Sequence, residues 1–183
     1  MNPPQNDPLI LTLTFEAEAA ERFDGMRRTY FPAALNRIPA HVTLFHHLAG
    51  NEEDEVREAI ARETRAQAPV EVAVTGLRFT GRGVAYVLAS DALSALRARL
   101  AQAFAPMLTA QDRQGWRPHV TIQNKVAPEV ARALHGELVA TFVPFSFIAP
   151  GLTLWRYLSG PWAHRADFAF SGEPFPMIRR CAP

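Results

Sequence analysis

A four-residue pattern occurs twice in the chain, and each copy places a threonine two positions after a histidine. The copies are His41-Val42-Thr43-Leu44 and His119-Val120-Thr121-Ile122. Side chains of a β-strand alternate between its two faces, so each copy presents its histidine and threonine on one face and two aliphatic residues on the other. The chain is therefore expected to contain two strands, each with a polar face backed by core. Two unrelated strand histidines are the simpler alternative.

Composition limits the kind of protein and ligand. The 183 residues are 48% apolar and 20% charged, which is typical of a globular chain with a substantial core. A net charge of +1 gives no global field for a long polyanion and favours a small or terminal phosphate ligand. The single cysteine, Cys181, excludes an intrachain disulfide and indicates a reducing compartment. With no apolar span long enough for a membrane and no leader pattern at the start, we expect a cytoplasmic protein.

Periodicity and turn residues indicate alternating strands and helices. Besides the two histidine strands, strands are predicted at 9–15, 70–79, 84–88, 142–148, 152–158 and 164–170, and helices at 16–30, 52–67, 92–104 and 128–140. Asp91 is the predicted N-cap of the third helix. The order of strand, helix, histidine strand, helix and further strands occurs twice. We therefore expect one α+β domain over residues 1–183 made of two related lobes, each contributing one histidine strand and neither independent.

Two imidazoles facing each other across a cleft suit cleavage of a phosphodiester by in-line attack. One proton must leave the attacking oxygen and another must reach the departing oxygen, and histidine, with an ordinary pKa near 6.5, can serve either role. The hydroxyls of Thr43 and Thr121 can donate hydrogen bonds to the non-bridging phosphate oxygens. This scheme needs no metal and no cofactor.

The twin patterns resemble the His-x-Thr-x motifs of the 2H phosphoesterase superfamily, which includes 2′–5′ RNA ligase-like proteins and cyclic nucleotide phosphodiesterases. That resemblance implies a bilobal α+β fold in which antiparallel sheets line a central cleft with helices outside. It also implies that His41 and His119 are the general acid and base, and that Thr43 and Thr121 bind phosphate. Which histidine is the base stays open.

The residues after each motif differ from those of many relatives. Here the motifs continue as Phe45-His46-His47-Leu48 and Gln123-Asn124-Lys125. Continued strand alternation predicts that Phe45 and His47 lie on the catalytic face of the first strand, and Gln123 and Lys125 on that of the second, unless a bulge intervenes. Phe45, Gln123 and Lys125 are therefore candidate substrate-binding residues, with Phe45 stacking on a base and Lys125 pairing with a phosphate. The alternatives are a core aromatic and a solvated lysine.

The resulting hypothesis is a metal-independent phosphoesterase that acts on 2′,3′-cyclic phosphate or 2′–5′ linked nucleotides or RNA ends. A binding module for nucleotides or RNA ends, without turnover, is the alternative. A metal-dependent hydrolase built on His41, His46 and His47 is disfavoured, because adjacent strand residues point to opposite faces and no carboxylate lies at ligand spacing. We expect a monomer without a membrane partner.

Overall fold

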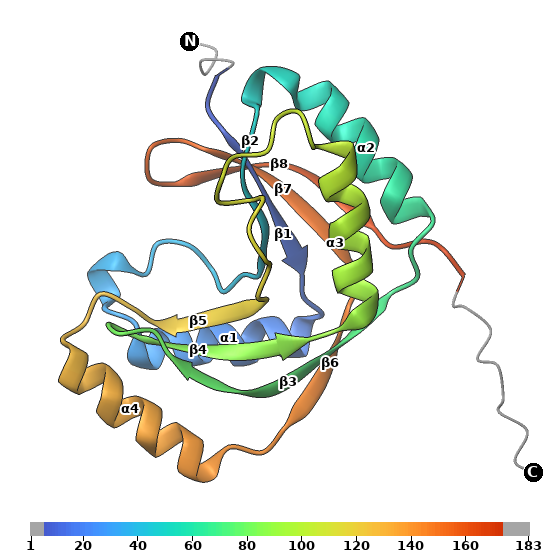
Figure 1. Ribbon diagram of the computed structural model, residues 1–183. Coiled ribbons are helices and arrows are strands. Elements are labelled where there is room, and N and C mark those ends of the chain that lie inside the picture. The colour runs from blue at the N-terminus through green and yellow to red at the C-terminus, as the bar shows by residue number, and fades with distance from the viewer. Residues whose placement is uncertain (1–5, 174–183) are drawn as a thin grey trace, which may run out of the picture.

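The computed structural model describes residues 6–173 and places two β-sheets against four α-helices (Figure 1). Cys181 lies outside these residues. The strands are β1 (Leu9–Thr14), β2 (Thr43–Leu48), β3 (Val70–Phe79), β4 (Val84–Ala89), β5 (His119–Gln123), β6 (Phe145–Ala149), β7 (Gly151–Tyr157) and β8 (Trp162–Ala169). The α-helices are α1 (Ala17–Tyr30), α2 (Glu53–Arg65), α3 (Asp91–Ala103) and α4 (Pro128–Thr141), and single 3₁₀ turns occur at Ala33–Leu35 and Gly50–Glu52.

Both sheets are antiparallel and have four strands, in the orders β2-β1-β7-β8 and β5-β4-β3-β6. Each motif strand, β2 or β5, lies at the edge of its sheet and pairs with the strand that precedes it in the chain. The second sheet comes from one continuous stretch, whereas the first combines strands from both ends of the chain (Figure 1). The predicted α+β fold with two antiparallel sheets is confirmed.

Helix α1 packs on the second sheet, although in the chain it lies between β1 and β2, which both belong to the first sheet. It contacts β5, while α4 contacts β3 and β4, and α2 contacts α3 and β8. The buried side of α1 follows from a spacing of four residues, which places Ala19, Phe23 and Arg27 on one helical face. Helix α1 thus places Arg27, which precedes the first motif in the chain, against β5, the strand of the second motif.

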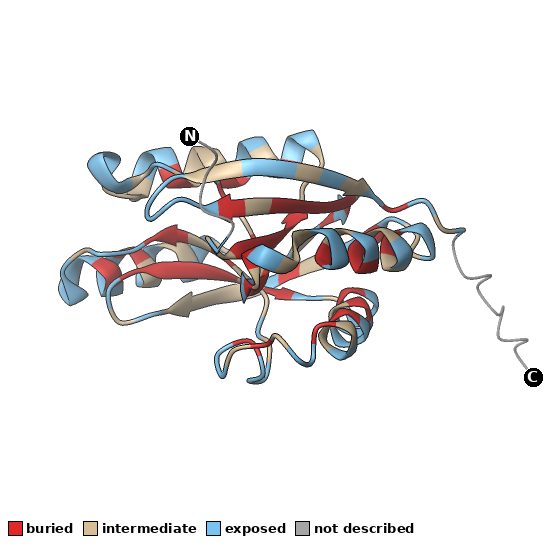
Figure 2. Cartoon of the chain, turned by 90° about the horizontal axis from the view of Figure 1, so that it is seen from above, coloured by how far each residue is buried: buried red, intermediate tan, exposed pale blue. Residues whose placement is uncertain are grey.

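The apolar core is shared by the two sheets. Buried residues form one cluster that includes Leu11 of β1, Phe23 of α1 and Val72 of β3. In a view from above, buried residues lie on the strands and inner helix faces, with exposed residues on the outer helix surfaces (Figure 2). None of the helices within residues 6–173 has the length and hydropathy needed to cross a bilayer.

Helix boundaries follow local capping chemistry. Ser90, not Asp91, is the N-cap of α3, because its hydroxyl accepts a hydrogen bond from the Leu93 N–H at 3.4 Å. The prediction for Asp91 was wrong by one residue, and its carboxylate instead lies in the first turn, where it complements the helix dipole. Pro128 opens α4, as its fixed φ and missing N–H allow.

A glycine controls how closely the edge of the second sheet is packed. A Cβ at Gly83, just before β4, would lie 1.9 Å from the carbonyl oxygen of Gln123 at the end of β5. Since no larger residue fits there without moving backbone, Gly83 lets the end of the second motif strand lie against the β3–β4 turn.

Candidate active site

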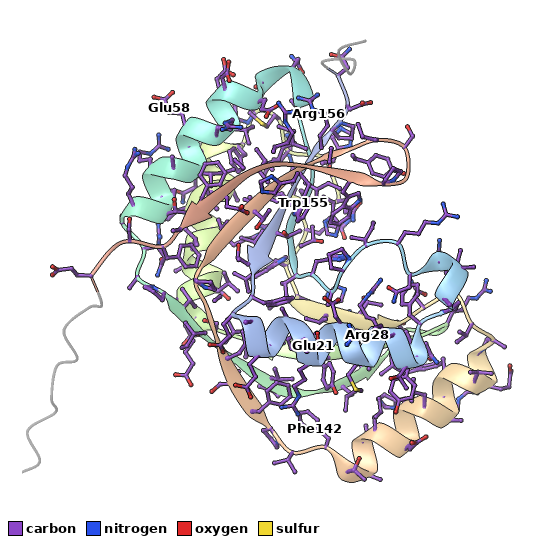
Figure 3. The ribbon with its side chains drawn as sticks, turned by 180° about the vertical axis from the view of Figure 1, so that it is seen from behind. Glu21, Arg28, Glu58, Phe142, Trp155 and Arg156 are labelled. Carbon is purple, nitrogen blue, oxygen red and sulfur yellow. The ribbon has the colours of Figure 1, made fainter. Side chains whose placement is uncertain are left out.

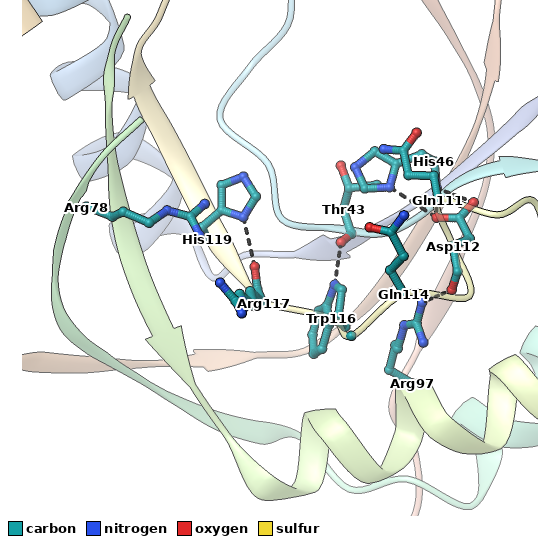
Figure 4. Close-up of a pocket in the computed structure, with 11 residues that line it drawn as sticks. Thr43, His46, Arg78, Arg97, Gln111, Asp112, Gln114, Trp116, Arg117 and His119 are labelled. Atoms are coloured by element: carbon teal, nitrogen blue, oxygen red, sulfur yellow. Dashed lines mark hydrogen bonds and ion pairs between the residues drawn. The ribbon is translucent and has the colours of Figure 1, made fainter. Parts of the chain in front are cut away.

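The two motif histidines are held in the same way by the backbone. Nδ1 of His41 lies 2.8 Å from the carbonyl oxygen of Pro39. Nδ1 of His119 lies 2.9 Å from the carbonyl oxygen of Arg117, an interaction drawn in Figure 4. A carbonyl oxygen can only accept a hydrogen bond, so each Nδ1–H donates and Nε2 is left with the free lone pair. Each imidazole is thereby fixed in the tautomer that can take a proton at Nε2.

Burial lowers the pKa of both histidines. For His41 the main cause is desolvation, which the Pro39 carbonyl opposes, and the positive charges of Arg27 and His119 lower the pKa further. For His119 desolvation is again the main cause, opposed by the Arg117 carbonyl, with Arg78 lowering the pKa as well. Because the charge on His119 affects His41, the two imidazoles share one electrostatic environment. Both are expected to be mostly neutral at neutral pH.

The backbone carbonyl groups of the motif threonines accept hydrogen bonds from side chains that are distant in sequence. The Trp116 indole N–H, from the segment before β5, donates to the Thr43 carbonyl at 2.9 Å (Figure 4). The Arg27 guanidinium, from α1, donates to the Thr121 carbonyl at 2.8 Å. Within residues 6–173 neither threonine hydroxyl has a protein hydrogen-bond partner. Both hydroxyls are thus available to a ligand while their backbones are fixed.

Arg27 connects the two motifs, although the sequence analysis did not select it. The side chain is buried and donates from Nε to Asn36 Oδ1 at 3.1 Å and from a terminal nitrogen to the Ile38 carbonyl at 3.1 Å, besides its bond to Thr121. Burial lowers its pKa, and the nearby Asp24 carboxylate opposes that effect. The position of Arg27 four residues after Phe23 was the available signal, since an arginine on an apolar helix face needs buried partners.

Phe45 is part of the core. Thr12 pairs with Thr43 and Leu11 with Phe45, so one step along β1 corresponds to two steps along β2. This bulge reverses the alternation, leaving Phe45 with 0% exposure and its ring edge-on to Phe104 at 5.2 Å. The prediction that Phe45 lies on the catalytic face and stacks on a base is therefore wrong, because a fully buried ring offers no surface to a ligand.

His46 occupies the cleft in place of Phe45. It lines a cavity of about 190 Å³ together with Thr43 of its own motif and His119 of the other (Figure 4). Both His46 and His47 are exposed, since the bulged strand no longer sends them strictly to opposite faces. No group of three or more His, Cys, Asp or Glu side chains in the described part of the chain is arranged to hold a metal ion.

Gln123 and Lys125 do not share the arrangement predicted by strand alternation. Gln123, the last residue of β5, is 4% exposed, and its Oε1 has no hydrogen-bond partner within the described residues. Lys125 lies beyond the strand in a left-handed backbone conformation with φ of 62° and is exposed. The strand pattern therefore stops before Lys125, and contact of either residue with a ligand remains a prediction.

Two tryptophans from the β7–β8 hairpin form an aromatic wall beside His41. The Trp162 ring centroid lies 4.8 Å from that of His41 and 6.2 Å from that of Trp155. Trp155, visible on β7 in Figure 3, donates from its indole N–H to the Thr12 hydroxyl at 2.8 Å. Trp162 is only partly buried. The sequence offered no motif that connects this hairpin with His41.

Comparisons with known proteins agree with this fold. The sequence profile of the 2′-5′ RNA ligase superfamily matches residues 15–161. The protein TT0787 of Thermus thermophilus is similar in structure, with 16% identity, a TM-score of 0.67 and coverage of 91% of this chain and 100% of that protein. E. coli LigT, solved in complex with 3′-AMP, has 16% identity and a TM-score of 0.60 over 91% of this chain and 99% of its own. No curated protein sequence matched the chain.

Proposed function

This chain belongs to the 2′-5′ RNA ligase superfamily, and we propose that it is a metal-independent phosphoesterase acting on a 2′,3′-cyclic phosphate or a 2′–5′ linkage in nucleotides or at RNA ends. The observation that carries the proposal is that His41 and His119 are oriented by the same kind of hydrogen bond. Each donates from Nδ1 to a backbone carbonyl and keeps Nε2 free. Two imidazoles in this tautomer suit a reaction in which one histidine accepts a proton from the attacking oxygen and the other donates a proton to the departing oxygen.

For a 2′,3′-cyclic phosphate the reaction requires two coordinated proton transfers. A water oxygen attacks phosphorus while the bond from phosphorus to one ribose oxygen breaks. One motif histidine accepts the proton of the water at Nε2, and the other, protonated beforehand, donates its Nε2 proton to the departing ribose oxygen. The product is a phosphomonoester, and exchange with solvent restores both imidazoles.

The threonines and the aromatic wall have separate roles in this proposal. The unpartnered hydroxyls of Thr43 and Thr121 donate to the non-bridging phosphate oxygens, where charge increases as the transition state forms. Trp162, beside His41, supplies a face on which a base can stack. A nucleotide ligand is supported by the complex of E. coli LigT with 3′-AMP.

The test is turnover of 2′,3′-cyclic nucleotides, 2′–5′ dinucleotides and short RNAs ending in a cyclic phosphate, with EDTA present throughout. The wild-type protein is expected to convert at least one of these substrates to a phosphomonoester or free end. The double variant His41→Ala/His119→Ala is expected to be inactive. Activity lost in EDTA and restored by one divalent ion would refute the metal-independent mechanism.

The same panel separates catalysis from recognition. Nucleotide binding measured by calorimetry without turnover of any substrate would identify a binding module and reject the enzymatic proposal. Turnover that survives in the double variant would place the chemistry elsewhere in the protein.

A further inference from the structure

The cavity beside the catalytic centre is lined by cationic and polar side chains and is here called the His46 pocket. Its lining includes Thr43 and His119 of the motifs together with His46, Arg78, Arg97, Asp112 and Arg117 (Figure 4). The volume of about 190 Å³ is below the roughly 300–1,000 Å³ usual for sites that enclose a whole small molecule. The pocket is therefore suited to one chemical group of a larger ligand.

Asp112 is a buried wall residue of this pocket and positions His46. Its carboxylate is 2% exposed and accepts hydrogen bonds from the backbone N–H groups of His46 and His47 and from Nδ1 of His46 at 3.1 Å. Burial alone raises a carboxyl pKa, but these donors prevail and the pKa of Asp112 is lowered. The carboxylate is thus ionised and occupied, and it fixes the His46 ring so that Nε2 is left for a ligand.

Three arginines give the pocket its charge. Within residues 6–173 the guanidinium groups of Arg78 and Arg117 form no hydrogen bond or ion pair with other side chains. Arg97 donates to the Asp112 carbonyl, lies 4.7 Å from the Phe45 ring centroid, and has a buried Nε without a partner in the described chain. Because the carboxylate of the pocket is already saturated, the surface offered to a ligand is positive, which favours an anion.

We propose that the His46 pocket binds a second phosphate of the substrate, namely the phosphodiester that joins the terminal nucleotide to its neighbour. The pocket and the catalytic centre share Thr43 and His119, so a ligand with its reacting phosphate at the motifs has its next phosphate within reach of the pocket. With Nδ1 of His46 held by Asp112, its Nε2 faces the pocket, where the guanidinium groups of Arg78 and Arg117 can donate to the phosphate oxygens. This inference rests on the proposed function and narrows its substrate from a mononucleotide to an RNA end.

Binding of two product-like ligands tests the pocket without relying on turnover. Calorimetry would compare adenosine 3′-monophosphate with the dinucleotide adenylyl-(3′→5′)-adenosine 3′-monophosphate, which has one additional phosphate. The wild-type protein is expected to bind the dinucleotide about tenfold more tightly. In His46→Asn the amide nitrogen takes the place of Nδ1 toward Asp112 while Nε2 is lost, and this preference should disappear with mononucleotide affinity changed less than about twofold.

A second variant and a matched control keep the result interpretable. Arg117→Gln removes a pocket charge but keeps the carbonyl that holds His119, so it should also reduce the preference for the dinucleotide. His47→Asn changes the adjacent exposed histidine outside the pocket and should leave both affinities unchanged. Higher salt should weaken binding of the dinucleotide more than that of the mononucleotide.

Several results would overturn the inference. These are equal wild-type affinity for the two ligands, no binding of either, or an equal loss for both in His46→Asn. Its failure is distinct from failure of the proposed function: turnover of cyclic mononucleotides with no dinucleotide preference rejects the pocket alone. A dinucleotide preference that depends on His46, in a protein without turnover, rejects the enzymatic function alone.

Discussion

His41 and His119 have the same backbone hold but different neighbours. Each donates from Nδ1 to the carbonyl two positions earlier. Beside His41 stands the Trp162 ring, whereas His119 has the charge of Arg78 nearby and lies in the His46 pocket. The short motif therefore fixes the tautomer. Segments distant in sequence add an aromatic ring beside His41, which also has Arg27 nearby, and further cationic side chains beside His119. We infer that the His41 side receives the nucleoside and the His119 side the phosphates.

The largest expected effect comes from removing either imidazole. His41→Ala and His119→Ala should each reduce kcat/KM by about 100-fold or more, because each removes one of the two proton transfers. The double variant should be little worse than the singles, since the two groups act as a unit. Steady-state kinetics on a cyclic-phosphate substrate measures this. A loss of kcat/KM in only one of the two single variants would show that His41 and His119 do not act as an acid-base pair.

The threonines should give smaller and similar losses. Thr43→Val and Thr121→Val keep the side-chain shape and backbone ties but remove the hydroxyl, and each should lower kcat by about 10- to 100-fold, as expected for a hydrogen bond to a charged group. Thr→Ser at either position restores the hydroxyl and should recover most of the activity. If valine is tolerated at one position, phosphate binding belongs to the other motif.

Arg27 should affect the two sides together. Arg27→Lys keeps the charge but cannot reach the acceptors on both the loop before His41 and on β5, so kcat should fall about tenfold with KM nearly unchanged. Arg28→Lys on the exposed side of the same helix (Figure 3) is the matched control and should be neutral. A change in KM without a change in kcat would contradict a positioning role.

Trp162 should affect one side only. Trp162→Leu removes the aromatic face beside His41 and should raise KM for a nucleotide substrate by about fivefold through lost stacking. Tyr157→Leu, at an exposed aromatic of the same hairpin, is the comparison variant. Equal KM for the wild type and Trp162→Leu would remove the assignment of the nucleoside to the His41 side.

The smallest effect concerns stability against pH. The folded protein lowers the pKa of both histidines, so it binds fewer protons than the unfolded chain, and the stability they contribute at pH 7 is lost as pH falls below about 6.5 through the folded pKa values. Thermal unfolding at pH 7 and pH 5 should show a smaller decrease in Tm for His41→Asn/His119→Asn than for the wild type. An identical decrease would mean that other groups account for the acid sensitivity.

Local patterns predicted most strands and helices, including the strand that begins at His119, because hydrophobic periodicity and turn residues act over a few positions. The prediction for the first motif was wrong at its start, since β2 begins at Thr43 and His41 lies just before it. Phe45 was misplaced because the β2 bulge depends on register with β1, which a single strand does not encode. Asp112 and Arg27 escaped notice for a related reason. The helical spacing from Phe23 indicates a buried position for Arg27, but the partners of both charges lie far away in sequence and can be identified only after the chain has brought them together.

The crossed hydrogen bonds at the threonine carbonyls have a consequence for synthesis of the chain. Trp116 donates to the Thr43 carbonyl, and Arg27 donates to the Thr121 carbonyl. Each motif is therefore positioned by a residue that lies near the other motif in the sequence. A nascent chain that ends before Trp116 already contains His41 but has neither bond. Activity should therefore arise late, only once the second motif has left the ribosome and docked on the first.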